Sequence, residues 1–311
     1  MTSAEIVHKL RSQLEEPLPL PGHGQTPLRH AKLWAAGVED LSFARIAEAH
    51  WDAIAILAEC GRQPKPKALY GVWASELPGQ ALRLEPDGDA LTISGNKMFC
   101  SGAGLVDCVL ITVGVPEKLL IEVDLRGTQT SVRYDTSAWA TSAFQETHTG
   151  GVTFTSCCIS PDAILGKAGW YLNRPGFWHG ACGPAACWAG GSEALVQYAK
   201  INPRTDAHTL AHLGAMHCCI WNMRTCLDAA GREIDTQPMD YEAAHVRALT
   251  VRHVIEQQCT DILRRFARAY GPFPLSMDAN ISQRYHELDL YLRQSHAERD
   301  LEVLGIRLLK I

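Results

Sequence analysis

Long stretches of helical periodicity fill the second half of this 311-residue chain and constrain its fold more than any other feature. Within residues 205–235, apolar side chains recur at the spacing of one buried helix face, at Leu213, Met216, Ile220, Met223 and Leu227. Helices are also predicted at 176–200, 241–270 and 279–309, the first rich in Gly and Ala, which lets a neighbouring backbone approach closely. Long helices with short connections favour an up-down four-helix bundle, which we predict for residues 169–311.

A different pattern precedes the bundle. Short apolar or alternating runs typical of β-strands occur, between turns rich in Gly, Pro and Asp, at 91–94, 108–113, 119–123 and 151–154. These runs predict a central antiparallel β-barrel or sandwich domain over residues 67–168. Residues 1–66 favour short helices instead, the clearest at 42–58. The predicted fold class is therefore α+β, with an N-terminal helical region, a central β domain and a C-terminal bundle.

Composition excludes several classes of function. The chain has 46% hydrophobic and 20% charged residues, enough for a large core, and its net charge of −5 offers no basic surface for nucleic acid. No apolar run reaches the ~18 residues of a membrane span, and the polar start is not a signal peptide, so we expect a soluble cytoplasmic protein. The cysteines include no Cys-x-x-Cys pair, and we predict that they are small buried hydrophobic residues, with no metal site.

The run Asn96–Asp107 contains the most informative motif. It follows an alternating segment, and its glycines supply the positive φ values of a tight turn, so the residues alone predict a β-hairpin. The run also resembles the flavin-facing hairpin of the acyl-CoA dehydrogenase family. In that family a Lys-x-aromatic-x-(Thr or Ser) strand end places a ring and a hydroxyl against the isoalloxazine, and an Asp opens the next strand. Phe99, Ser101 and Asp107 hold these places here.

Other segments agree with this resemblance in the same order along the chain. Ser42–His50 resembles the family's helix before the sheet domain, and Trp73–Gly79 resembles its (Thr or Ser)-Glu-Pro cofactor loop. Val152–Phe154 and Ile159–Gly166 resemble the strand and loop that leave that domain, and the helical half completes the series. The resemblance covers about residues 40–308.

The resemblance implies a flavoprotein that holds FAD between sheet and bundle, as a homodimer or homotetramer. Trp73 and Ser75 fall in the cofactor loop, with Ser75 at the pyrimidine edge of the flavin. Ser101 falls near flavin O4 and N5, and Phe99 replaces the family's more common Trp beside the ring. Two family motifs are changed. The Gly-Ser-Asp after the cofactor loop is absent, which removes a phosphate-contacting hydroxyl, and the Arg-x-x-Phe-Gly motif is reduced so that Arg204 remains as a candidate phosphate ligand.

The residues expected to act as a catalytic base also depart from the family. There, a carboxylate removes the α-proton of an acyl thioester while flavin N5 accepts a hydride from the β-carbon. The usual Glu position falls on or beside Ser295, and the position used by some relatives, within 175–179, holds no carboxylate either. His296 and His179 lie in these two neighbourhoods and are candidate bases, since imidazole titrates near neutral pH. The alternative is that His296 is a solvated or salt-bridged helix residue.

Three other carboxylates are weaker candidates. Glu287 and Asp289 would reach the base position only after a shift of a turn or two in helix register, and we expect one of them to pair with Arg284 or Arg293 instead. Glu76, although it lies in the cofactor loop, is expected to be a turn or cap carboxylate.

Three functions are consistent with these residues. We predict an FAD-dependent dehydrogenase that oxidises an acyl-CoA or acyl-carrier thioester with an atypical base and passes electrons to an electron-transfer acceptor. The first alternative is a flavin-dependent monooxygenase of the same fold, which takes reduced flavin from a flavin reductase and needs no α-proton base. The segment Phe99–Gly102 and His296 match features of such relatives. The second alternative is a pseudoenzyme or binding subunit that kept the fold without the base.

Overall fold

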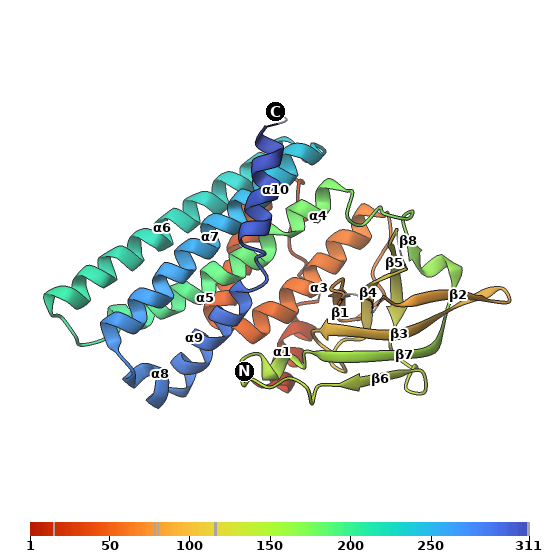
Figure 1. The fold of residues 1–311 in the computed structure, drawn as a ribbon, viewed down its shortest axis with the longest axis horizontal. Helices are drawn as coiled ribbons and strands as arrows, with labels where there is room; N and C mark the ends of the chain where they lie inside the picture. The colour runs from red at the N-terminus through yellow and green to blue at the C-terminus, as the bar shows by residue number, and fades with distance from the viewer. Residues whose placement is uncertain (15, 78, 80, 115–116, 310–311) are drawn as a thin grey trace. The chain divides into compact units, whose positions relative to one another are not determined.

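The computed structural model describes residues 1–309 apart from 15, 78, 80, 115 and 116 (Figure 1). Contacts within the chain divide it into two compact units. The first, here called the β unit, contains residues 1–17 and 45–177. The second, the helical unit, contains residues 18–44 and 178–311.

The helices of the predicted N-terminal region 1–66 are divided between these units. Helix α1 (Ser3–Ser12) belongs to the β unit, and α2 (Thr26–Glu39) belongs to the helical unit. Helix α3 (Leu41–Glu59) begins in the helical unit and continues through the β unit. Residues 1–66 are therefore helical as predicted, but they supply parts of both units.

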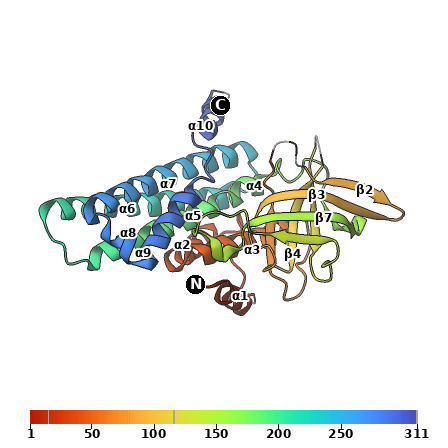
Figure 2. The same cartoon turned by 60° about the horizontal axis from the view of Figure 1, so that its bottom comes forward.

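Two four-stranded sheets form the body of the β unit. The first sheet has the order β1 (Tyr70–Trp73), β4 (Cys108–Val113), β5 (Leu119–Asp124) and β8 (Ile164–Leu165). The second has the order β2 (Arg83–Asp87), β3 (Ala90–Cys100), β7 (Gly150–Ile159) and β6 (Val132–Asp135), and its long β3–β7 pair is visible in Figure 2. Neighbouring strands are antiparallel, as predicted, except that β1 and β4 run parallel.

The sequence pattern of each strand explains its burial. Strand β4 is an unbroken apolar run apart from Thr112, and all six of its residues are buried. Its side chains share a hydrophobic core with Tyr70 of β1 and with Ile56 and Leu57 of α3. Strand β7 instead alternates at its centre, where Phe154 is buried and its neighbours face solvent. All four predicted strand runs lie within observed strands.

The helical unit contains the predicted bundle. Its helices are α5 (Cys182–Ile201), α6 (Ala207–Thr236), α7 (Tyr241–Tyr270) and α9 (Ala279–Leu292), with the short α4 (Pro175–Gly180) before them and α8 (Phe273–Met277) between α7 and α9. Helix α2 also packs on α5 and α6, an association that the sequence did not predict. A Cβ added to Gly190 of α5 would lie 2.0 Å from the carbonyl oxygen of Trp34 on α2, so the predicted close approach of a backbone to this Gly- and Ala-rich helix is confirmed.

The predicted helix 279–309 is broken, which corrects one expectation. Helix α9 ends at Leu292, and α10 (Glu298–Leu308) begins six residues later. Side chains stop the helix because they accept backbone N–H groups that a continuous helix would bond to carbonyls. Asp300 accepts from the N–H of His296 at 3.2 Å, and Ser295 Oγ accepts from the N–H of Ala297 at 3.3 Å. His296 therefore lies in a loop, residues 293–297, rather than on a helix.

The cysteine prediction is right in part. Seven cysteines are buried, but Cys158 and Cys218, each next to a buried cysteine, are exposed because adjacent positions of a strand or helix face different ways. No three His, Cys, Asp or Glu side chains gather as a metal site requires within the described residues. Across the same residues, every helix is too short or too polar to cross a membrane.

Candidate functional site

The end of β3 presents an exposed aromatic ring. The pairing of β3 with β7 shifts register between Lys97 and Cys100, and Phe99 adopts φ +59° there. A left-handed backbone is strained for a bulky residue and normally persists only where its surroundings impose it. The Phe99 side chain is nevertheless 50% exposed, so its own burial does not offset this strain. A ring held in this way is available to stack on a planar ligand.

The Ser101 hydroxyl, two residues later, is the start of a hydrogen-bonded network. Arg45 Nε, from α3, donates to Ser101 Oγ at 3.0 Å. Ser101 Oγ lies 2.9 Å from Thr149 Oγ1, which lies 2.7 Å from Thr147 Oγ1. Thr147 in turn donates to the carbonyl oxygen of Phe144 at 2.7 Å. We call Ser101, Thr149 and Thr147 the hydroxyl chain.

The direction of the hydrogen bonds in the hydroxyl chain follows from the number of protons available. Each hydroxyl has one proton to donate. Thr147 uses its proton on the Phe144 carbonyl, so Thr149 is the donor to Thr147. Thr149 then has no proton left, so Ser101 is the donor to Thr149. Because Arg45 also donates to Ser101, the Ser101 oxygen keeps one lone pair and no proton for a ligand.

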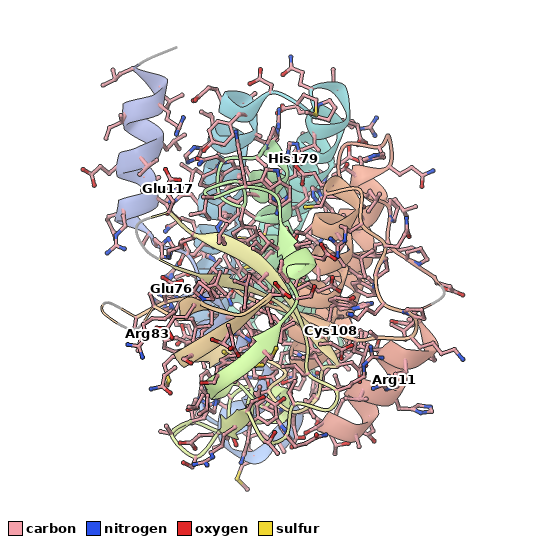
Figure 3. The ribbon with its side chains drawn as sticks, turned by 90° about the vertical axis from the view of Figure 1, so that its right-hand side faces the viewer. Arg11, Glu76, Arg83, Cys108, Glu117 and His179 are labelled. Atoms are coloured by element: carbon pink, nitrogen blue, oxygen red, sulfur yellow. The ribbon has the colours of Figure 1, made fainter. Side chains whose placement is uncertain are left out.

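The predicted cofactor loop is held to the sheets at Trp73 and at Glu76. Trp73 is buried, and its Nε1–H donates to the carbonyl oxygen of Ser101 at 2.8 Å. Ser75 is exposed. The following residue, Glu76, is labelled in Figure 3. It accepts from Lys118 Nζ at 2.7 Å and from Thr112 Oγ1 at 3.0 Å. The loop that carries Ser75 is thus held against the strands while Ser75 itself faces outward.

Glu76 has a structural role, but it pairs with lysine side chains instead of acting as the turn or cap carboxylate expected from the sequence. Its second cationic neighbour is Lys97 Nζ at 3.6 Å, and the Lys97 side chain is almost fully buried. Burial alone would raise the pKa of Glu76, but the hydrogen bond from Lys118 and the charge of Lys97 more than offset it, so the pKa lies below its usual value. Burial lowers the pKa of Lys97, with the Glu76 charge opposing that effect. Glu76 is therefore an ionised anchor of the loop, unsuited to accept a proton.

The remaining predicted residues lie in the helical unit. His179 is buried, and its Nε2 lies 2.9 Å from the carbonyl oxygen of Pro238, which requires the proton on Nε2. His296 Nδ1 lies 3.2 Å from Asp300 Oδ1, with the imidazole 64% exposed. The contact with Asp300 is of the kind that the alternative for His296 describes, although His296 lies in a loop and not on a helix. Ser295 adjoins it, whereas Arg204 is exposed and donates to the carbonyl oxygen of Ala269 at 2.9 Å.

The two helix carboxylates take different partners. Asp289 is exposed and lies 3.5 Å from Arg293, which confirms one of the expected pairs. Glu287 is buried and accepts from Ser42 Oγ at 2.7 Å and from Gln283 at 3.0 Å. Both are occupied by structural contacts.

Sequence reasoning missed the groups that support Ser101. Thr147 and Thr149 belong to none of the predicted motifs, and Arg45 lies in the segment Ser42–His50, where no role was predicted for it. A weak signal was present, because Arg45 interrupts the run Phe43–Ala47, whose other residues are apolar. Asp107, predicted to open the next strand, does precede β4, where its carboxylate accepts from Arg11 and from the N–H of Leu69.

Helices from both ends of the chain, two four-stranded sheets and a C-terminal bundle define the acyl-CoA dehydrogenase-like fold, as predicted. The sequence matches no family model and no curated protein.

Solved structures share this fold over nearly the whole chain. The complex of TdsC, a dibenzothiophene monooxygenase from Paenibacillus sp. A11-2, with FMN and indole has a TM-score of 0.80 at 14% identity, covering 99% of this chain and 96% of that chain. The methanesulfinate monooxygenase MsuC from Pseudomonas fluorescens has a TM-score of 0.74 at 15% identity, covering 97% and 93%. A nitrososynthase from Micromonospora carbonacea var. africana has a TM-score of 0.76 at 13% identity, covering 97% and 93%. At these identities the likeness establishes the fold.

Proposed function

We propose that this chain is a flavin-dependent monooxygenase that receives reduced flavin, rather than the acyl-thioester dehydrogenase that the sequence alone favoured. The observation that carries the proposal is the direction of the hydroxyl chain, which leaves Ser101 Oγ as an acceptor. The resemblance places this oxygen near flavin N5. Two of the structural neighbours are named as monooxygenases, which supports the same choice.

Flavin N5 has different hydrogen-bonding needs in the two redox states. Oxidised flavin has a bare N5 with a lone pair, which needs a hydrogen-bond donor. Reduced flavin has an N5–H group, which needs an acceptor. Because Ser101 Oγ offers a lone pair, it can accept a hydrogen bond from the N5–H of reduced flavin. In oxidised flavin the same lone pair would face the lone pair of N5, and no hydrogen bond would form. A dehydrogenase binds its substrate in the oxidised state, so this arrangement suits it poorly.

The residues of the β unit fit a flavin. Phe99 supplies an exposed ring for the face of the isoalloxazine, and Trp73 fixes the Ser101 backbone through a hydrogen bond. When bound, reduced flavin would supply the electrons that activate oxygen for transfer to a substrate. Arg204 remains our candidate phosphate ligand, and Ser75 our candidate for the pyrimidine edge.

We propose FMN as the cofactor in place of the FAD first predicted. The family's pyrophosphate-contacting motifs are changed in this chain, and a single phosphate demands fewer such contacts. The TdsC complex contains FMN, which supports the smaller cofactor. A monooxygenase of this kind needs a flavin reductase as a partner, and a homodimer or homotetramer remains our expectation.

The helical unit also lacks what a dehydrogenase requires at the predicted base position. The loop 293–297 contains Ser295 and His296 but no carboxylate, and Asp300 of the following helix is engaged with His296. Asp300 orients the imidazole through Nδ1, which leaves Nε2 to exchange a proton or a hydrogen bond. We propose His296 for that role. An α-proton base is unnecessary for oxygen transfer.

Anaerobic titration of the purified protein tests the proposal. We expect reduced FMN to bind roughly tenfold or more tightly than oxidised FMN, because an unmatched buried lone pair costs ~1–3 kcal/mol. FAD, titrated in the same way, decides between the cofactors. Ser101→Ala should remove most of the redox preference.

Two results would contradict the proposal. Tight binding of oxidised flavin that an acyl-CoA bleaches without oxygen would restore the dehydrogenase. Failure to bind flavin in either redox state would favour a pseudoenzyme.

A further inference from the structure

The loop between α9 and α10, residues 293–297, is held by a side chain from a different helix. Arg252 of α7 donates through Nη2 to the carbonyl oxygen of Gln294 at 2.7 Å. Through Nη1 it donates to the carbonyl oxygen of Ala181 at 3.0 Å. Its guanidinium carbon lies 4.8 Å from the centre of the Trp188 ring. All four residues belong to the helical unit.

This arrangement needs the shape of a guanidinium. The two carbonyls belong to chain segments more than a hundred residues apart, and a planar fork can donate to both at once. Trp188 is fully buried, so the ring against which the fork lies is itself fixed. A lysine would keep the positive charge, but its compact ammonium lacks the planar reach to bridge both acceptors.

The two segments joined by Arg252 carry the candidate histidines. Ala181 lies two residues after His179, and Gln294 immediately precedes Ser295 and His296. The loop also contains Ala297 at φ +49°, a conformation that an alanine adopts only under constraint from its surroundings. The hydrogen bond from Arg252 provides such a constraint at the other end of the loop.

We propose that Arg252 is a positioning residue that sets the loop 293–297, and with it His296, for the flavin reaction. Its role in catalysis rests on the proposed function, whereas its hold on the loop does not. Without the Arg252 guanidinium, the loop loses a charge-assisted hydrogen bond and its attachment to the start of α5. His296 would then spend less time in its reactive position.

Hydrogen exchange tests the hold on the loop. In Arg252→Gln, amides of residues 294–299 should exchange roughly 10- to 100-fold faster, the range expected when a hydrogen bond to a charged group is lost. Arg252→Lys should give a similar local increase despite its charge, and it serves as the second variant if the glutamine variant folds poorly. Arg264→Lys is the matched control, because Arg264 lies on the same helix but pairs at the surface with Asp261.

Unchanged loop exchange in both Arg252 variants would overturn the proposal, as would an equal increase throughout α5 and α7. Reoxidation of bound reduced FMN by oxygen tests the catalytic part. We expect Arg252→Lys to slow this step roughly tenfold while the Kd for reduced FMN changes less than about twofold. An unchanged rate with a loosened loop would overturn the positioning role. If the wild-type protein binds no flavin, the proposed function fails, and the exchange result still decides whether Arg252 holds the loop.

Discussion

Replacing Thr149 with valine should reverse the hydrogen-bonding character of Ser101 without touching Ser101 itself. Valine keeps the shape of threonine but has no oxygen, so the Ser101 proton loses its acceptor in the hydroxyl chain. Arg45 still donates to the serine oxygen. The hydroxyl is then free to turn its proton toward a ligand, where it would meet the bare N5 of oxidised flavin.

The magnitude follows from the contacts that change. Thr149 is about 1% exposed, so its removal from the chain takes place in a buried site where unmatched polar groups cost ~1–3 kcal/mol. We expect the preference for reduced FMN to fall roughly tenfold, which corresponds to ~30 mV in the two-electron potential of the bound flavin. The same loss of buried hydrogen bonds should lower the free energy of unfolding by ~1–2 kcal/mol.

Anaerobic reductive titration with a reference dye measures this potential. Thr153→Val is the matched control, because Thr153 lies on the same strand, β7, but is exposed and donates only to Asn96 among the hydrogen bonds found. Its potential should equal that of the wild type. If Thr149→Val binds FMN with an unshifted potential, the direction assigned to the hydroxyl chain is wrong, and the argument for reduced flavin is lost with it.

Three other predictions concern strain, packing and pH. Phe99→Gly should raise the free energy of unfolding by ~1 kcal/mol, because glycine relieves the strain of the left-handed backbone. The same change should weaken FMN binding several-fold, because the aromatic ring is lost. Lower stability with intact FMN binding would contradict the placement of Phe99 against the flavin. Gly190→Ala should destabilise the helical unit by more than ~3 kcal/mol in urea unfolding, because its Cβ would collide with the Trp34 carbonyl, and a neutral result would mean that α2 does not pack there. Burial lowers the pKa of His30 and of His50 to about 4, so below pH ~6.5 the unfolded chain binds protons more readily than the folded chain. The free energy of unfolding should therefore fall by about 2 kcal/mol for each histidine between pH 7 and 5. A free energy of unfolding in urea that stays constant over that range would refute this.

Much of the fold was predictable because periodicity is a local property. The apolar run of β4 and the helical spacing within α6 each require only a few neighbouring residues to be recognised. The break between α9 and α10 was missed for the same reason. Residues 293–297 contain no Gly or Pro that would signal a stop, and the stop depends on the side chains of Ser295 and Asp300, which compete for backbone N–H groups.

Only those residues of the candidate site that belong to a sequence motif could be predicted. Phe99 and Ser101 stand in a recognisable strand end, and their neighbours in sequence place them on a hairpin. Thr149 lies 48 residues from Ser101 in sequence, and Arg45 lies 56 residues away. No local pattern connects such residues, because their contact exists only after the sheet has formed and α3 has packed on it. The groups that determine how Ser101 bonds are therefore invisible to periodicity.

The loop 293–297 and the hydroxyl chain both favour the proposed monooxygenase over a dehydrogenase. Dehydrogenation of an acyl thioester requires a carboxylate base and a donor toward the N5 of oxidised flavin. In the proposed function, the resemblance places the carboxylate on or beside Ser295, next to which the loop 293–297 holds His296, and the hydroxyl chain leaves Ser101 as an acceptor. Either change alone would be compatible with an inefficient dehydrogenase. Together, on the proposed function, they leave out both groups that only the dehydrogenase needs, while an aromatic ring, an acceptor for N5–H and an imidazole remain for a reduced flavin.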